Sequence, residues 1–82
     1  MNGKVTPFRH IREFVFGEPK AAPFADALGI SRPHLSRLEK GESPSHALLI
    51  RVRSLAAKRG ITWEDRYFFE VPAHIRAAED LQ

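Results

Sequence analysis

Residues 22–38 read APFADALGISRPHLSRL, and this stretch decides how the chain folds. Its first half places apolar side chains on one face of a helix, and Gly29 follows where a helix commonly ends in a left-handed residue. Ser31 then suits the N-cap of a second helix, whose inward-facing pair is Leu35 and Leu38. The pattern predicts two short helices joined by a tight turn.

The flanking sequence predicts further short helices on both sides of this pair. Helical spacing and Gly or Pro punctuation predict helices at residues 7–15, 21–28, 32–40 and 46–59, with Ser43 or Ser45 capping the last of these. Thr62 is a candidate cap for a short fifth element, with Asp65 three residues on, and residues 73–81 are a candidate final helix. Only residues 66–71 have a strand-like pattern. The chain is therefore expected to be all-α.

Residues 23–43, PFADALGISRPHLSRLEKGES, resemble the Cro/CI-type (XRE-like) helix-turn-helix domain of phage and bacterial repressors. The matching features are Phe24-Ala25, Leu28-Gly29-Ile30-Ser31, the run from Leu35 to Glu39, and Gly41. The resemblance covers about residues 6–62. It implies a compact five-helix, lambda-repressor-like domain at residues 1–62, with residues 63–82 as a short C-terminal extension. Such a domain binds double-stranded DNA through its third helix, usually as a dimer on a pseudo-palindromic operator.

The resemblance also implies roles for residues on and around the third helix. Candidate base contacts are Arg32, Pro33, Ser36 and Arg37, since an Arg can bind guanine O6 and N7 with two N–H groups. Candidate phosphate contacts are Lys20, Ser31, His34, Lys40, Ser43 and Ser45. The alternative for Ser31 is a helix cap only. For His34 it is mere exposure, and for Lys20 and Lys40 it is simple solvation.

Glu39 matches the acidic member of a family ion pair that ties the third helix to the first. Arg12 is its expected partner and Arg9 the rival, and a partly exposed pair of this kind contributes about 0–1 kcal/mol. The sequence departs from the family at Ala21, where Gln is usual, and at Pro33, which offers apolar contact only. Four cations of the fourth helix are expected to face solvent: Arg51, Arg53, Lys58 and Arg59.

The charge is unevenly distributed along the chain. Residues 1–60 hold 11 Lys or Arg against 5 Asp or Glu, whereas residues 61–82 hold 2 against 5, for a formal net charge of +3. A basic body favours a polyanionic partner such as nucleic acid. The acidic tail is a candidate contact for RNA polymerase or another regulator.

Four aromatic residues lie within seven positions of the C-terminal part: Trp63, Tyr67, Phe68 and Phe69. One or two of them are expected to complete the small core. The rest, with Ile75, form the predicted dimer surface, because aromatic side chains are enriched at the centres of interfaces. The alternative is that all four only close the core.

Composition excludes several other classes of function. A chain of 82 residues forms one small domain, without room for a large substrate cleft. It has no Cys, and its four His lack the spacing of a metal site, so we expect no enzymatic activity, cofactor or metal. Without a signal sequence or an apolar span, the expected location is the cytoplasm, on the nucleoid of a bacterium or in the host of a phage.

These features together predict a sequence-specific transcriptional regulator, a repressor acting as a homodimer on DNA. Two other functions fit the same features. One is an antitoxin or protein-interaction module whose aromatic tail binds a partner protein. The other is an architectural protein that binds DNA without sequence preference, with nearly equal affinity for random and selected DNA.

Overall fold

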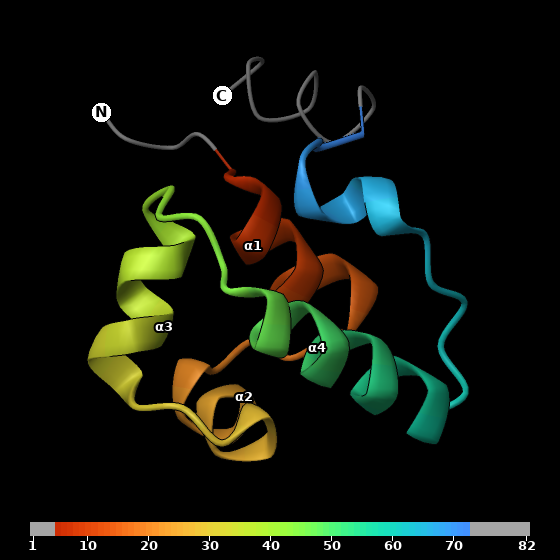
Figure 1. Cartoon of the computed structure of the whole chain (residues 1–82), viewed down its shortest axis with the longest axis horizontal. Helices are drawn as coiled ribbons and strands as arrows, with labels where there is room; N and C mark the ends of the chain where they lie inside the picture. The colour runs from red at the N-terminus through yellow and green to blue at the C-terminus, as the bar shows by residue number, and fades with distance from the viewer. Residues whose placement is uncertain (1–4, 73–82) are drawn as a thin grey trace.

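The computed structural model describes residues 5–72, and this part of the chain is all-helical, as the sequence predicts. The elements are α1 (Pro7–His10), a π-helical continuation η1 (Ile11–Val15), α2 (Ala21–Leu28), α3 (Arg32–Glu39), α4 (His46–Lys58) and a 3-10 helix η2 (Asp65–Phe68). Figure 1 shows α3 at the left edge and η2 at the upper right, with α1 between them. No strand occurs among the described residues.

Side-chain caps fix where three of the helices begin. The hydroxyl of Thr6 accepts a bond from the backbone N–H of Arg9 at 3.4 Å, and Ser31 accepts one from His34 at 3.1 Å. The hydroxyl of Ser45 accepts a bond from the backbone N–H of Leu48 at 3.2 Å, so Ser45 rather than Ser43 caps α4. Each cap satisfies one of the N–H groups that a helix start leaves without a helical partner.

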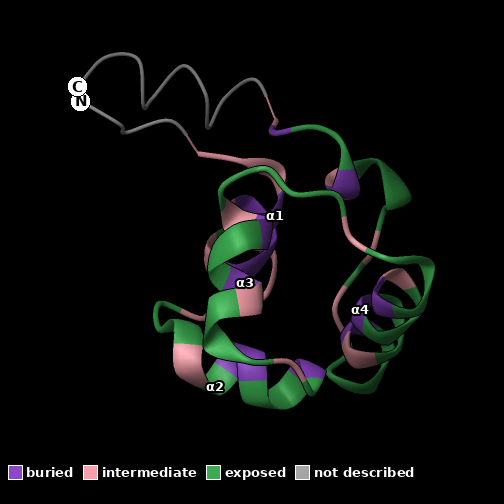
Figure 2. Ribbon diagram, turned by 60° about the vertical axis from the view of Figure 1, so that its left-hand side comes forward, coloured by how far each residue is buried: buried purple, intermediate pink, exposed green. Residues whose placement is uncertain are grey.

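The core lies where all four α-helices meet. Its largest fully buried side chains come from η1, α2, α3 and α4, and they are Ile11, Phe24, Leu35, Leu38 and Val52. Figure 2 shows the buried residues turned toward the centre and the exposed residues on the outer sides of the helices. Because each helix buries a single face, the opposite face of each stays in solvent.

The segment after α4 differs from the sequence prediction. Residues 65–68 form a 3-10 turn, so the strand-like pattern at residues 66–71 does not form a strand. The Thr62 cap is wrong, because Glu64 precedes the turn with no side-chain cap bond. The reason is the aromatic packing. The Trp63 ring lies 5.2 Å from Tyr67 and 5.0 Å from Phe68 between centroids. A tight turn brings all three rings to the core, whereas a strand would send the last two to opposite faces.

Two further findings concern the described residues 5–72. None of their helices is long and apolar enough to cross a membrane, and no group of three or more acidic or His side chains is placed to hold a metal ion. The expected helix at residues 73–81, and Ile75 with it, lies outside the described residues.

Candidate nucleic-acid interface

The outer face of α3 is the candidate DNA-reading surface. Leu35 and Leu38 are 0% and 1% exposed and fix the inner side of the helix. At about 100° per residue, the side opposite them carries Pro33, Ser36, Arg37 and Lys40, and all four are exposed. Arg32 is also exposed and lies at the edge of this face nearest α1. All four candidate base contacts therefore reach solvent, and Figure 2 shows this side of α3 exposed.

Arg12, in the continuation η1 of the first helix, anchors the C-terminal end of α3. Its Nε donates to Glu39 Oε2 at 2.6 Å and its Nη2 to Glu39 Oε1 at 3.1 Å. Its Nη1 donates to the carbonyls of Glu18 and Pro19 at 3.1 and 2.7 Å, so the guanidinium also holds the α1–α2 connection. The hydrogen bond with Glu39 is the main cause that raises the pKa of Arg12.

This ion pair is more buried than the sequence analysis expects. The side chains of Arg12 and Glu39 are only 8% and 15% exposed, so the value for a partly exposed pair does not apply. The rival partner, Arg9, bonds Glu13 instead, at 2.9 Å. Thr6 adds a second link, because its hydroxyl donates to the backbone carbonyl of Glu39 at 2.6 Å. The end of α3 is thus fixed to α1 at two points.

The two candidate base-reading arginines have different surroundings. Arg37 Nε donates to Glu42 Oε1 at 3.1 Å, and both side chains are largely exposed. Arg32 has no side-chain partner among the described residues and borders an open groove of about 500 Å³ between α1 and α3. Ala21, at the position where the resembling family usually has Gln, lines the same groove.

The candidate phosphate contacts surround α3. Ser31 and Ser45 both act as helix caps, and each hydroxyl keeps its own O–H free to donate to an anion. Four others are exposed or half-buried, with no side-chain bond to another described residue: Lys20, His34, Lys40 and Ser43. The structure places them at the start of α2, on α3 and in the loop after it, so they border the reading face.

The cations of α4 do not all have the role expected from the sequence. Arg51 is exposed, yet its Nη1 donates to the carbonyls of Leu28 and Gly29 at 3.2 and 3.4 Å, at the end of α2. A cation is favourable there because the last carbonyls of a helix carry partial negative charge. Arg51 is thus exposed as expected, and it also braces the turn into α3. No local sequence signal predicts this contact, because Arg51 and Gly29 are 22 positions apart in the chain.

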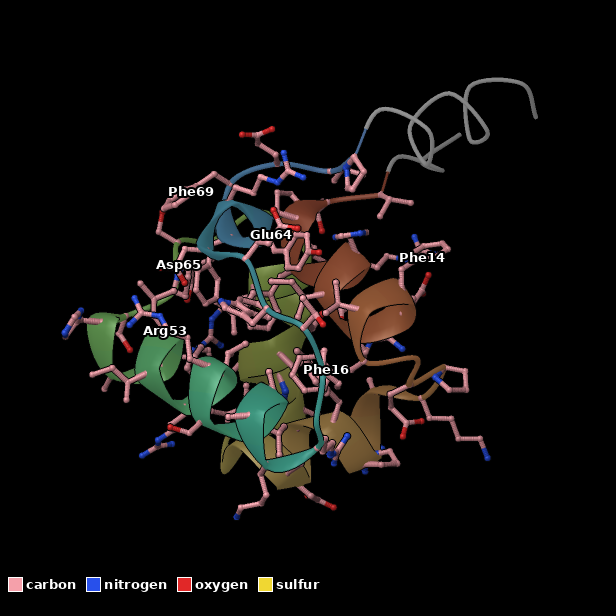
Figure 3. All side chains as sticks on the ribbon, turned by 90° about the vertical axis from the view of Figure 1, so that its right-hand side faces the viewer. Phe14, Phe16, Arg53, Glu64, Asp65 and Phe69 are labelled. Atoms are coloured by element: carbon pink, nitrogen blue, oxygen red, sulfur yellow. The ribbon has the colours of Figure 1, made fainter. Side chains whose placement is uncertain are left out.

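Arg53 of α4 and Arg59, the residue after α4, also make contacts that the sequence did not predict. Arg53 Nε lies 3.1 Å from Asp65 Oδ1, and the Arg59 guanidinium lies 5.8 Å from the centre of the Phe16 ring. Figure 3 shows Arg53 and Asp65 together at the junction of α4 and the C-terminal segment. These contacts fasten Asp65 to α4, and Phe16, directly after η1, to Arg59, directly after α4.

The predicted dimer residues divide into core and surface. Phe68 is 8% exposed and belongs to the core, and Trp63 and Tyr67 pack against that core. Phe69 is 75% exposed and stands at the edge of the molecule in Figure 3. A hollow of about 180 Å³ lies beside it, between Phe69 and the loop after α3. Three of the four aromatics thus belong to the core or pack against it, whereas Phe69 makes an edge contact with the Phe68 ring at 6.4 Å and keeps most of its surface in solvent.

No family model, curated protein or solved structure matches the chain. The function must therefore be argued from geometry and chemistry. The site holds exposed guanidinium, ammonium and hydroxyl groups and one half-buried imidazole around one well-anchored helix. Such groups are donors that can bind phosphate oxygens and base edges.

Proposed function

We propose that this chain is a sequence-specific, double-stranded DNA-binding transcriptional regulator with a lambda-repressor-like helix-turn-helix fold. The observation that carries the proposal is the outer face of α3. It presents Arg32, Arg37 and Lys40 to solvent, and the one carboxylate of this helix, Glu39, is turned inward to Arg12. A surface that is cationic and firmly held suits a polyanion that must be read in one register.

The dimensions of α3 support docking in the major groove. An α-helix with its side chains is about 10–12 Å in diameter, and the major groove of B-DNA is about 12 Å wide, so α3 fits into the groove. The exposed arginines then face base edges. The start of the helix, where the Arg32 N–H has no helical acceptor, lies toward the phosphates. Lys20, Lys40 and the loop to α4 flank this contact on the backbone side.

The proposed assembly is a homodimer that blocks a promoter. A single helix contacts few bases, and a two-fold dimer presents two such helices about 34 Å apart, one turn of DNA. Phe69 supports this part of the proposal, since a side chain 75% exposed in a monomer gains from burial against a partner. Repression is the simplest mode for a domain of this size, because occupancy of a promoter needs no further part.

Selection of bound sequences from random double-stranded DNA tests the proposal. We expect enrichment of a palindromic motif whose half-sites are separated by about one helical turn. The matched control is Lys58→Ala, which removes an exposed cation of α4 and should select the same motif. Binding of random and selected DNA with equal affinity would support the architectural alternative instead, and absence of binding would overturn the proposal.

The dimer is tested by sedimentation of Phe69→Ser. We expect this variant to dissociate at concentrations where the parent is dimeric, and to keep its thermal stability, because Phe69 lies outside the core. The control is Phe14→Ser, since Phe14 is the other exposed phenylalanine among the described residues. A parent chain that remains monomeric, or a Phe69→Ser variant as dimeric as the parent, contradicts this assembly.

A further inference from the structure

Three helices of the chain end in the same backbone turn. Each has a left-handed glycine: Gly29 after α2, Gly41 after α3 and Gly60 after α4, with φ of 71°, 117° and 68°. The glycine N–H donates to the carbonyl three residues back, at 3.1 Å in all three. The next N–H donates five residues back, at 3.0, 3.0 and 2.9 Å in the same order. This is the Schellman arrangement, which folds the chain back over the last turn of the helix.

The three turns differ in the residue that follows the glycine, which is apolar in two of them and charged in the third. In the Schellman arrangement this residue lies over the helix residue that accepts its N–H, and the contact is usually apolar. Ile30 and Ile61 follow that rule and are half-buried, above Ala25 and Ala56. After α3 the residue is Glu42, which is exposed.

Glu42 lies over Arg37 and bonds it twice. The backbone N–H of Glu42 donates to the Arg37 carbonyl at 3.0 Å, and the Arg37 Nε donates to Glu42 Oε1 at 3.1 Å. The side-chain bond uses one of the five guanidinium donors. The Nη1 and Nη2 groups have no partner among the described residues, so the end of the side chain is held from behind with its two amino groups unoccupied.

We propose that Glu42 is a positioning residue that makes Arg37 a guanine reader, an inference that rests on the proposed DNA-binding function. The bond to Nε restricts the rotamers of Arg37 before DNA arrives, so less side-chain entropy is lost on binding. The two Nη groups remain for guanine O6 and N7. The Glu42 carboxylate also repels a phosphate at this place, which favours a base over the backbone as the partner of Arg37.

The same structure sets Arg32 apart from Arg37. Arg32 has no anchoring carboxylate among the described residues and borders the open groove beside α1. Its side chain keeps its rotamer freedom, and a mobile cation binds any nearby phosphate oxygen without selecting a base. The inference therefore assigns most of the guanine preference of one half-site to Arg37.

The test compares Glu42→Ala and Glu42→Gln with the parent chain. The readout is the preference for guanine over the other three bases at the operator position whose preference Arg37→Ala abolishes. We expect Glu42→Ala to lower that preference about fivefold or more. Its affinity for random DNA should stay equal or rise, because a negative charge is removed. Glu42→Gln keeps an oxygen that accepts from Nε and should retain most of the preference.

Two controls separate positioning from a general effect. Glu70→Ala removes an exposed carboxylate after η2 and should leave the guanine preference unchanged. In an Arg37→Ala background, Glu42→Ala should cause no further loss of preference at that position. An unchanged preference in Glu42→Ala, or an equal loss for all sequences with a lower unfolding midpoint, overturns the inference. If the parent selects no motif at all, the proposed function itself fails.

Discussion

Two Arg–Glu pairs hold the end of α3, and they differ in burial, in distance and in the segments that they join. Arg12 and Glu39 meet at 2.6 Å with side chains 8% and 15% exposed. Arg37 and Glu42 meet at 3.1 Å with side chains 57% and 45% exposed. The first pair joins α3 to a helix 27 residues earlier, whereas the second joins α3 to its own following loop.

The difference shows how burial decides what such a pair does. The Arg12 guanidinium bonds two carboxylates and two carbonyls, so its N–H donors are used within the protein and none is left for a ligand. A buried charge requires such complete pairing. The Arg37 pair is screened by water and contributes little to stability. That pair instead leaves two amino groups of Arg37 facing solvent, where the proposed function would have them bind DNA.

The largest effect that can test this comparison is on stability. Glu39→Ala leaves the Arg12 charge buried without its main partner, and we expect the free energy of unfolding to fall by roughly 3–5 kcal/mol. Urea denaturation measures it. Glu42→Ala is the matched control, since it breaks the exposed pair on the same helix, and its expected loss is about 0–1 kcal/mol. Equal losses in the two variants would mean that burial does not distinguish the pairs.

Local signals predicted most of the fold. Gly29 and the cap at Ser31 gave the turn between α2 and α3, and the bounds of α2 match those expected from the sequence. The all-α class followed from the same signals. Such signals act within a few residues, so both capping and glycine termination can be read from a single sequence.

The burial and the partners of contacts between distant residues could not be predicted from the sequence. The resemblance indicated that Arg12 and Glu39 pair, yet their burial depends on α1, the α1–α2 connection and α3 meeting at one point. The brace from Arg51 to the end of α2 has no sequence signal. The position of Glu42 does have a sequence signal, because the residue after a C-terminal glycine lies over the last helical turn.

The next effect concerns DNA recognition and leaves stability almost unchanged. Arg37→Ala should cost about 1–3 kcal/mol on the selected site and relax one base position, because its two amino groups no longer reach guanine. Binding to the selected site and to its single-base variants measures this. Arg53→Ala is the control, as it breaks another exposed pair, with Asp65, away from α3. If Arg37→Ala binds selected and random DNA as the parent does, Arg37 does not read a base.

The smallest effect belongs to Lys40, which lies between the two pairs and joins neither. It is exposed on the outer face of α3, and no described residue pairs with it, so its ammonium group is free for a phosphate. Lys40→Ala should weaken binding to all sequences alike and lower the slope of log affinity against log salt by about 1, since one released counterion is lost. Salt titrations on selected and random DNA measure the slope, with Lys58→Ala as the control that should leave it unchanged. A loss confined to the selected site would place Lys40 with Arg37 among the base-reading residues, and the outer face of α3 would then read bases along its whole length.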